Sequence, residues 1–165
     1  MFGMDSDTLI KLTRAGAKEV VASAVEAVVP PAVEREAVVE GREGGFPDAF
    51  EIERNLKKLV RVVRVPKTRE TETIIEKLGL RGGEADVFRL FRGGKCRAVA
   101  SDDQKFLDLV AALNVPFVTP SALVIHVWKR GKIGKEECLR LLEKLRPMVS
   151  EEEYQLATIE LKGGG

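Results

Sequence analysis

Short apolar runs alternate along this chain with longer stretches in which apolar residues recur every three or four positions. The short runs predict buried strands, and they cover residues 1–4, 25–29, 59–65, 96–100 and 114–119. The longer stretches predict helices, and they cover residues 8–15, 18–23, 32–41, 47–58, 68–78, 82–91, 106–110, 121–129, 135–146 and 154–161. Strands and helices that alternate through short connections favour a mainly parallel sheet between two helical layers. We therefore predict an α/β protein with a three-layer α/β/α sandwich.

Individual residues refine this pattern. Arg61 and Arg64 interrupt the run at 59–65, so we expect this strand near the edge of the sheet. Ser150 and Glu153 have the spacing of a capping box, which predicts the start of the last helix.

The composition is typical of a globular protein without a membrane segment or a disulfide framework. The 165 residues carry a formal net charge of +1, which argues against a basic, non-specific nucleic-acid coat. Cys96 and Cys138 lie far apart, without a CxxC spacing or a histidine partner, so we expect buried thiols rather than a zinc site. No apolar run approaches membrane-spanning length. We expect a single domain over residues 1–165, located in the cytoplasm.

Acidic residues gather where predicted strands end or predicted helices begin. They are Asp5, Asp7, Glu36, Glu84, Asp86, Asp102 and Asp103. In a right-handed parallel sheet these junctions lie at one edge, where open α/β folds place their ligands. Two structural roles stay open as alternatives. Asp7 would serve as the N-cap of the first helix, and Glu84 and Asp86 would interact with a helix dipole.

Such a cluster predicts a bound metal ion. Four or more carboxylates with no Lys or Arg in the same turns repel one another, and a bound cation relieves this repulsion. The pattern therefore predicts one or two hard divalent ions, Mg²⁺ or Mn²⁺, which prefer oxygen ligands and suit a phosphate-containing substrate. Two such ions activate a water and stabilise the leaving oxygen of a phosphodiester.

Four short motifs, in order along the chain, resemble those of the PIN domain. Residues 5–10, Asp-Ser-Asp-Thr-Leu-Ile, resemble its opening acidic motif, and residues 30–36 resemble the motif in which Glu follows a Pro-x-x-Val stretch. Residues 83–86, Gly-Glu-Ala-Asp, are similar to a helix start of one PIN subgroup and of related flap-type nucleases. Residues 101–106 are similar to its Thr-x-Asp-x-x-Phe element. The resemblance covers about residues 1–135, followed by a helical extension at 136–162.

The resemblance implies a ribonuclease that depends on Mg²⁺ or Mn²⁺ and cleaves RNA. Such proteins are often the toxin of a VapBC-type pair, with an antitoxin protein as partner, and are commonly homodimers. The metal-site and catalytic acids that it implies are Asp5, Glu36, Asp86 and Asp103. Glu84 is an alternative or additional third acid, because the family places its acid at either position of this motif. The supporting residues are Asp7, Ser101 and Asp102.

The chain also departs from the usual PIN pattern. Its first strand is short, the segment at 41–58 is larger and the region beyond Gly131 is longer, which resembles a poorly characterised prokaryotic subgroup. One alternative is a catalytically inactive PIN-like scaffold that binds RNA or a protein. Another is a phosphatase of the haloacid-dehalogenase type, which also begins with Asp-x-Asp after a strand. Those enzymes have a further residue before Thr-Leu, whereas Thr8 follows Asp7 directly here.

Overall fold

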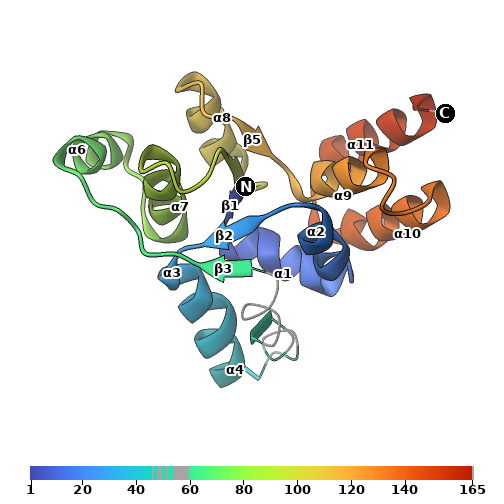
Figure 1. Cartoon of the computed structure of the whole chain (residues 1–165), viewed down its shortest axis with the longest axis horizontal. Helices are drawn as coiled ribbons and strands as arrows, with labels where there is room; N and C mark the ends of the chain where they lie inside the picture. Colours follow the sequence, from blue (N-terminus) through green and yellow to red (C-terminus); the bar gives the residue numbers. More distant parts are fainter. Residues whose placement is uncertain (46, 48–49, 51, 54–59, 165) are drawn as a thin grey trace.

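A parallel sheet forms the centre of the protein (Figure 1). The computed structural model describes residues 1–45, 47, 50, 52–53 and 60–164. Over these residues the sheet has five strands, all parallel to their neighbours. In spatial order they are β3 (Val60–Val62), β2 (Ala27–Val29), β1 (Phe2–Met4), β4 (Ala98–Ala100) and β5 (Phe117–Val118). The predicted edge position of the strand around Arg61 is confirmed.

Helices occupy most of the chain between and after the strands. Those before β4 are α1 (Ser6–Arg14), α2 (Lys18–Ala24), α3 (Pro31–Glu34), α4 (Gly41–Glu43), α6 (Arg69–Leu78) and α7 (Gly82–Arg92). Those after β4 are α8 (Gln104–Ala112), α9 (Pro120–Lys129), α10 (Lys135–Leu145) and α11 (Glu151–Gly163). A π-helix, η1 (Arg35–Glu40), joins α3 to α4, and a 3₁₀ turn, η2 (Arg146–Met148), joins α10 to α11. No helix in the described part of the chain has the length and apolarity needed to cross a membrane.

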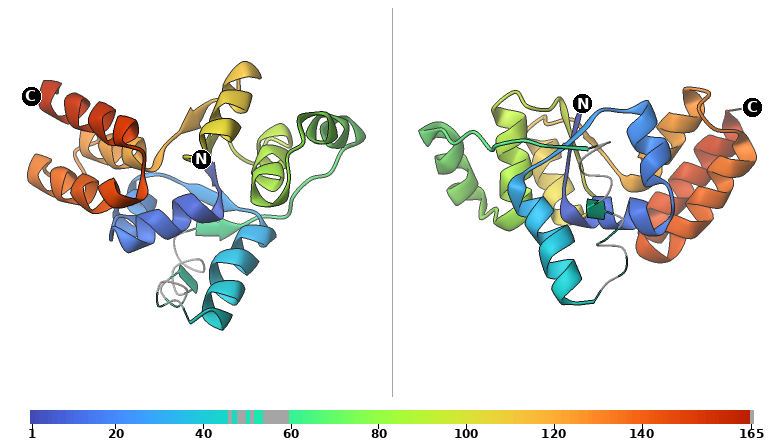
Figure 2. Two further views of the ribbon diagram at one scale, coloured as in Figure 1. Left: turned by 180° about the vertical axis from the view of Figure 1, so that it is seen from behind. Right: turned by 60° about the horizontal axis from the view of Figure 1, so that its bottom comes forward.

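The two faces of the sheet pack against different sets of helices, because successive strand residues point to opposite faces. Met4, Val29 and Ala100 belong to the larger core, together with buried residues of α1, α2, α9, α10 and α11. Val28 and Val99 contact buried residues of the α7 side of the sheet. Figures 1 and 2 show α9, α10 and α11 grouped beside α1 and α2, with α6, α7 and α8 grouped separately. The predicted α/β fold with a parallel sheet between helices is confirmed.

Some helix ends differ from their prediction. The first helix begins at Ser6, and its N-cap is Asp5, which accepts a hydrogen bond from the Thr8 N–H at 2.8 Å. The alternative of Asp7 as the N-cap is therefore wrong. The helix predicted for residues 32–41 is confirmed in position, but its second half is a π-helix. The helix predicted for residues 47–58 falls largely outside the described residues.

The last strand and the last helix differ in detail. The run predicted for residues 114–119 is a strand only at Phe117 and Val118. Ser150 caps α11 as predicted, since its Oγ accepts from the Glu153 N–H at 3.1 Å. The Glu153 carboxylate instead accepts from the Ser121 N–H, 2.8 Å away. It therefore joins α11 to α9.

Candidate active site

The site begins where the two central strands of the sheet end. β1 and β4 lie side by side with Met4 opposite Ala100, and the Asp5 N–H donates to the Ala100 carbonyl at 3.3 Å. From β1 the chain continues to β2 and β3 on one side, and later returns to β4 and β5 on the other. The order reverses between β1 and β4, and ligands of open parallel sheets bind at such a point.

Asp5 and Asp103 have the same structural role in the segments that follow these strands. Each is the N-cap of the following helix: the Asp5 carboxylate accepts from the Thr8 N–H, and the Asp103 carboxylate accepts from the Phe106 N–H at 2.8 Å. Ser101 directly follows β4, is fully buried, and accepts a hydrogen bond from the Asp103 N–H at 3.2 Å. Capping fixes both carboxylates relative to the sheet, because each is tied to a helix that begins at its edge.

Two further acids reach this position from neighbouring helices. Glu36 lies in the π-helix that follows β2, and its carboxylate accepts a hydrogen bond from Ser6 Oγ at 2.8 Å. π-Helical turns are frequent at functional sites. Glu84 lies in the first turn of α7, next to Gly83. A Cβ on Gly83 would lie 3.8 Å from Glu36 Oε2, so the start of α7 is close to Glu36.

These four acids line one cavity of about 450 Å³. The other residues in its lining are Ser6, Asp7, Arg81, Gly82, Gly83 and Asp102. Asp5 is the buried member, with 7% of its surface exposed, whereas Glu36 and Asp103 are exposed. The sheet edge thus gathers acids that are separated by up to about a hundred residues of sequence.

The carboxylates in this cavity repel one another. Burial raises the pKa of Asp5, and hydrogen bonds from Ser101 and Thr8 only partly oppose this effect. The pKa of Glu84 is also raised, first by burial and then by the negative charges of Asp103 and Asp5. A nearby cation would favour the ionised form of both groups.

Lys11 compensates part of the negative charge at one side of the cavity. Its Nζ lies 2.6 Å from an Asp7 oxygen and 2.5 Å from an Asp102 oxygen. Burial lowers the pKa of Lys11, but the hydrogen bonds to Asp102 and Asp7 outweigh burial and raise it overall. Lys11 therefore neutralises part of the charge of the acids, although it does not stand in the same turns of the sequence. Lys11 lies one turn into α1 and its long side chain reaches back to the sheet edge.

Asp86 does not line this cavity. Its carboxylate lies 2.6 Å from Arg89 Nη1, and Arg89 also makes two hydrogen bonds to Glu72 of α6, both at 2.7 Å. The structure therefore places Asp86 in an ion-pair network between α6 and α7, while Glu84 of the same turn lies with the other acids.

The donor chemistry of the cavity fits a hard divalent cation. The acids of its lining offer carboxylate oxygens, the ligands that Mg²⁺ and Mn²⁺ prefer, and its described lining residues include no thiol or imidazole. Among the described residues, no three Asp, Glu, His or Cys side chains are already arranged closely enough to hold an ion. Ion binding would thus require uncapped acids, such as the exposed Glu36, to turn toward Asp5.

Two basic residues of the site were not identified from the sequence. Arg81 precedes α7 as its N-cap residue and lines the cavity. Lys11 forms the ion pairs described above. An i, i+4 spacing links Asp7 to Lys11 and was the available signal for that pair. No comparable pattern marks Arg81.

Comparison with protein families gives a match that agrees with this arrangement. A model of the PIN domain family DUF3368 matches residues 1–161, which include every acid of the cavity and also the C-terminal helices α10 and α11. Comparisons with curated proteins and with solved structures found no match. The matched region spans nearly the whole chain, and its parallel sheet carries the acids at the expected edge. The chain belongs to the PIN domain family.

Proposed function

We propose that the protein is a metal-dependent ribonuclease that hydrolyses phosphodiester bonds of single-stranded RNA. PIN domains are typically nucleases and typically bind divalent metals. The observation that supports this proposal most strongly is the convergence of Asp5, Glu36, Glu84 and Asp103 on one cavity. A role as a VapC-type toxin, with an antitoxin partner and a homodimeric state, stays a prediction from the motif resemblance.

The proposed roles follow from the position of each side chain. Asp5, Glu36, Glu84 and Asp103 would hold Mg²⁺ or Mn²⁺. When bound, the ion supplies a nucleophilic water at neutral pH and stabilises charge on the phosphodiester. Asp5 and Asp103 are held by their capping hydrogen bonds, so they provide the fixed part of the site. Glu36, which is exposed, and Glu84, which is half-buried, provide the adjustable part.

Arg81 is suited to bind the RNA backbone at this cavity. It is exposed and lies in the lining beside Gly82 and Gly83. A guanidinium group forms paired hydrogen bonds with phosphate oxygens. It would therefore position a phosphodiester over the acids without joining their metal-binding set.

Of the two candidates for the third acid, the geometry favours Glu84. Its carboxylate lies in the field of Asp5 and Asp103, whereas the Asp86 carboxylate is paired with Arg89. An acid that is already neutralised by a guanidinium is a poor ligand for an additional cation.

Cleavage of a fluorescently labelled single-stranded RNA tests the proposed ribonuclease activity and the choice of Glu84 as the third acid. With Mn²⁺ or Mg²⁺ we expect cleavage by the wild type, and a loss of about 100-fold or more in rate for Asp103→Asn and Glu84→Gln. Asparagine retains the capping capacity of Asp103, so folding is preserved. Asp86→Asn is the matched control, for which we expect a rate within about threefold of the wild type.

Three results would overturn parts of this account. Cleavage that persists in EDTA, or in the Asp103→Asn, Glu84→Gln double variant, would refute the metal-dependent mechanism. Loss of activity in Asp86→Asn with full activity in Glu84→Gln would make Asp86 the third acid. Hydrolysis of para-nitrophenyl phosphate without RNA cleavage would support the phosphatase alternative.

A further inference from the structure

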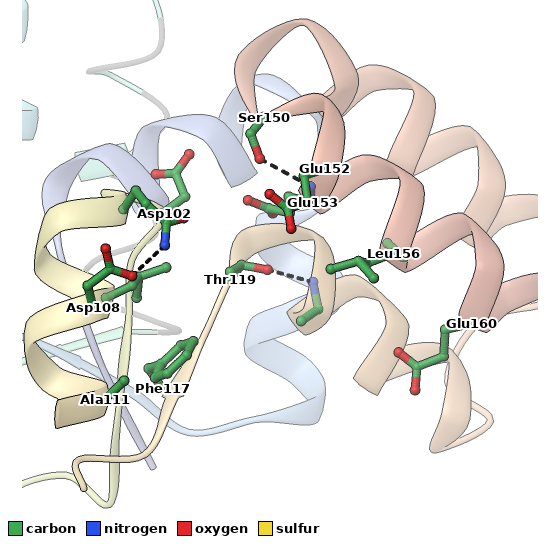
Figure 3. A pocket seen from close by; sticks show the side chains of 14 residues that line it. Asp102, Asp108, Ala111, Phe117, Thr119, Ser150, Glu152, Glu153, Leu156 and Glu160 are labelled. Atoms are coloured by element: carbon green, nitrogen blue, oxygen red, sulfur yellow. Dashed lines mark hydrogen bonds between the residues drawn. The ribbon is translucent and has the colours of Figure 1, made fainter. Parts of the chain in front are cut away.

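A second cavity, which we call the α8–α11 cavity, lies between α8, β5, the start of α9 and α11 (Figure 3). Its volume is about 300 Å³. Figure 3 shows Asp108 and Phe117 on one side of it and Glu152 and Leu156 on the α11 side. It shares Asp102 with the acidic cavity at the strand ends, but none of its other described lining residues lines that cavity.

The charged residues that line this cavity are all acidic. They are Asp102, Asp108, Glu152, Glu153 and Glu160, and the described lining contains no Lys or Arg. Two of these acids have a cationic partner from outside the cavity, since Lys11 pairs with Asp102 and Lys129 pairs with Glu160.

Other acids of the lining meet neutral donors instead of cations. Asp108 accepts a hydrogen bond from Gln104 at 2.7 Å, and Glu153 accepts from the Ser121 N–H at 2.8 Å. Neutral donors satisfy hydrogen bonds without cancelling charge. The α8–α11 cavity is therefore electronegative, which favours a cationic ligand and repels nucleic-acid phosphates.

Large apolar side chains are exposed in this cavity and beside it. Leu156 is 62% exposed and Phe117, on the edge strand β5, is 45% exposed. Ile159, which lies on α11 outside the lining, is 64% exposed. Among the described large apolar residues, Leu156 and Ile159 have the highest exposure. Apolar side chains that gather on a surface with a polar rim are typical of protein interaction sites.

We propose that the α8–α11 cavity binds a short segment of a partner protein that carries an arginine next to a bulky apolar residue. The guanidinium group would pair with Asp108 and Glu152, and its aliphatic part would pack on Phe117, where a cation–π contact is also available. The neighbouring apolar residue would cover Leu156. A volume of about 300 Å³ accommodates such side chains rather than a folded domain.

The proposal is independent of the nuclease activity, and peptide selection tests it directly. Phage-displayed random peptides are selected on the immobilised full-length chain, and a selected peptide is labelled for fluorescence polarisation. We expect the peptides to share an Arg within three positions of Leu, Phe or Trp. Binding should weaken at least tenfold in Glu152→Lys and in Leu156→Ser, both exposed changes on α11 that leave the buried core intact.

Matched variants on α10 serve as controls. Glu136→Lys and Leu139→Ser make the same chemical changes at exposed positions outside this cavity, and they should leave binding unchanged. Peptides without this consensus, no selected peptide, or equal loss in the α10 controls would overturn the proposal. A wild-type dimer that dissociates in Leu156→Ser would also overturn it, because a second copy of the chain would then occupy the surface. RNA cleavage in Glu152→Lys and Leu156→Ser is measured alongside, so a failure here is distinct from a failure of the nuclease proposal.

Discussion

The Asp5 carboxylate is a proposed metal ligand and also the N-cap of α1. It must be ionised to hold a cation, yet it is almost fully buried, and burial raises its pKa. Its hydrogen bond from the Thr8 N–H also makes it the cap of α1. The metal-free protein therefore stores an electrostatic cost at this residue, as functional sites often do.

We expect Asp5→Asn to stabilise the metal-free protein by about 1 kcal/mol at neutral pH. Asparagine keeps the cap and removes the buried charge. A raised folded-state pKa means that the folded state binds the proton more tightly, so wild-type stability falls as pH rises from the ordinary pKa of Asp through the raised value. The gain should therefore disappear below about pH 4. Urea unfolding in EDTA at several pH values measures it.

Asp108→Asn is the control for this experiment. Asp108 is an exposed aspartate of α8, and we expect its replacement to change the free energy of unfolding by less than about 0.5 kcal/mol. A pH-independent gain in Asp5→Asn, or a loss at neutral pH, would contradict the assignment of a buried, destabilising charge.

Lys11 has the opposite effect on stability. Its ion pairs with Asp7 and Asp102 join the start of α1 to the segment after β4, and the Asp102 side chain is largely buried. Lys11→Met should lower the free energy of unfolding at neutral pH by about 1–3 kcal/mol, because it leaves Asp102 without its cation. Lys11→Arg keeps the positive charge, so its free energy of unfolding should fall by less than that of Lys11→Met. Equal stability of Lys11→Met and the wild type would show that the pairs contribute nothing.

The positions of some site residues could not be predicted from the sequence. Glu84 and Asp86 are two positions apart in one helical turn, so they lie on different faces of α7. Which face meets the sheet edge depends on how α7 packs, and the motif alone left both acids open. Lys11 and Arg81 are long side chains that reach the cavity from adjacent turns, and local spacing does not fix where such side chains end.

Gly3 determines how closely α7 approaches the central strand. A Cβ at Gly3 would lie 2.9 Å from Cys96 Sγ and 3.4 Å from Val87. We therefore expect Gly3→Ala to cost about 1–3 kcal/mol of stability by overpacking. Part of this loss should return in Gly3→Ala combined with Cys96→Ala, because the second change removes the closest atom. Thermal unfolding of the single and double variants measures both.

The control here is Gly163→Ala, whose Cβ would meet nothing within 4 Å. It should leave stability unchanged. If Gly3→Ala were equally harmless, the packing between β1 and α7 would not restrict the size of the side chain at position 3.

Elements with strong local signals were predicted well. The strands before Asp5 and Asp103 and the helix at 68–78, with Thr68 as its cap, appear close to their expected positions. The differences arise where tertiary contacts decide. The helix after Pro31 widens into a π-helix, and Glu153 leaves its capping box to bind the Ser121 N–H.

The fold of the whole molecule brings the acids of the four motifs to one edge of the sheet. Parallel strands in the order β3-β2-β1-β4-β5 place Asp5 and Asp103 after neighbouring strands, and Glu36 lies in the helix after β2. This convergence was predictable, because the carboxyl ends of parallel strands share one edge. The α8–α11 cavity was not, because it depends on how α11 lies against β5 and α8.

A crystal of the wild type soaked in Mn²⁺, measured at the manganese absorption edge, tests the proposed metal site most directly. We predict an anomalous difference peak in the cavity, coordinated by carboxylate oxygens of Asp5 and Asp103 with Glu36 or Glu84, and no such peak in an Asp5→Asn, Asp103→Asn crystal. Absence of a peak in the wild type, or a peak that persists in the double variant, would contradict the proposed metal site.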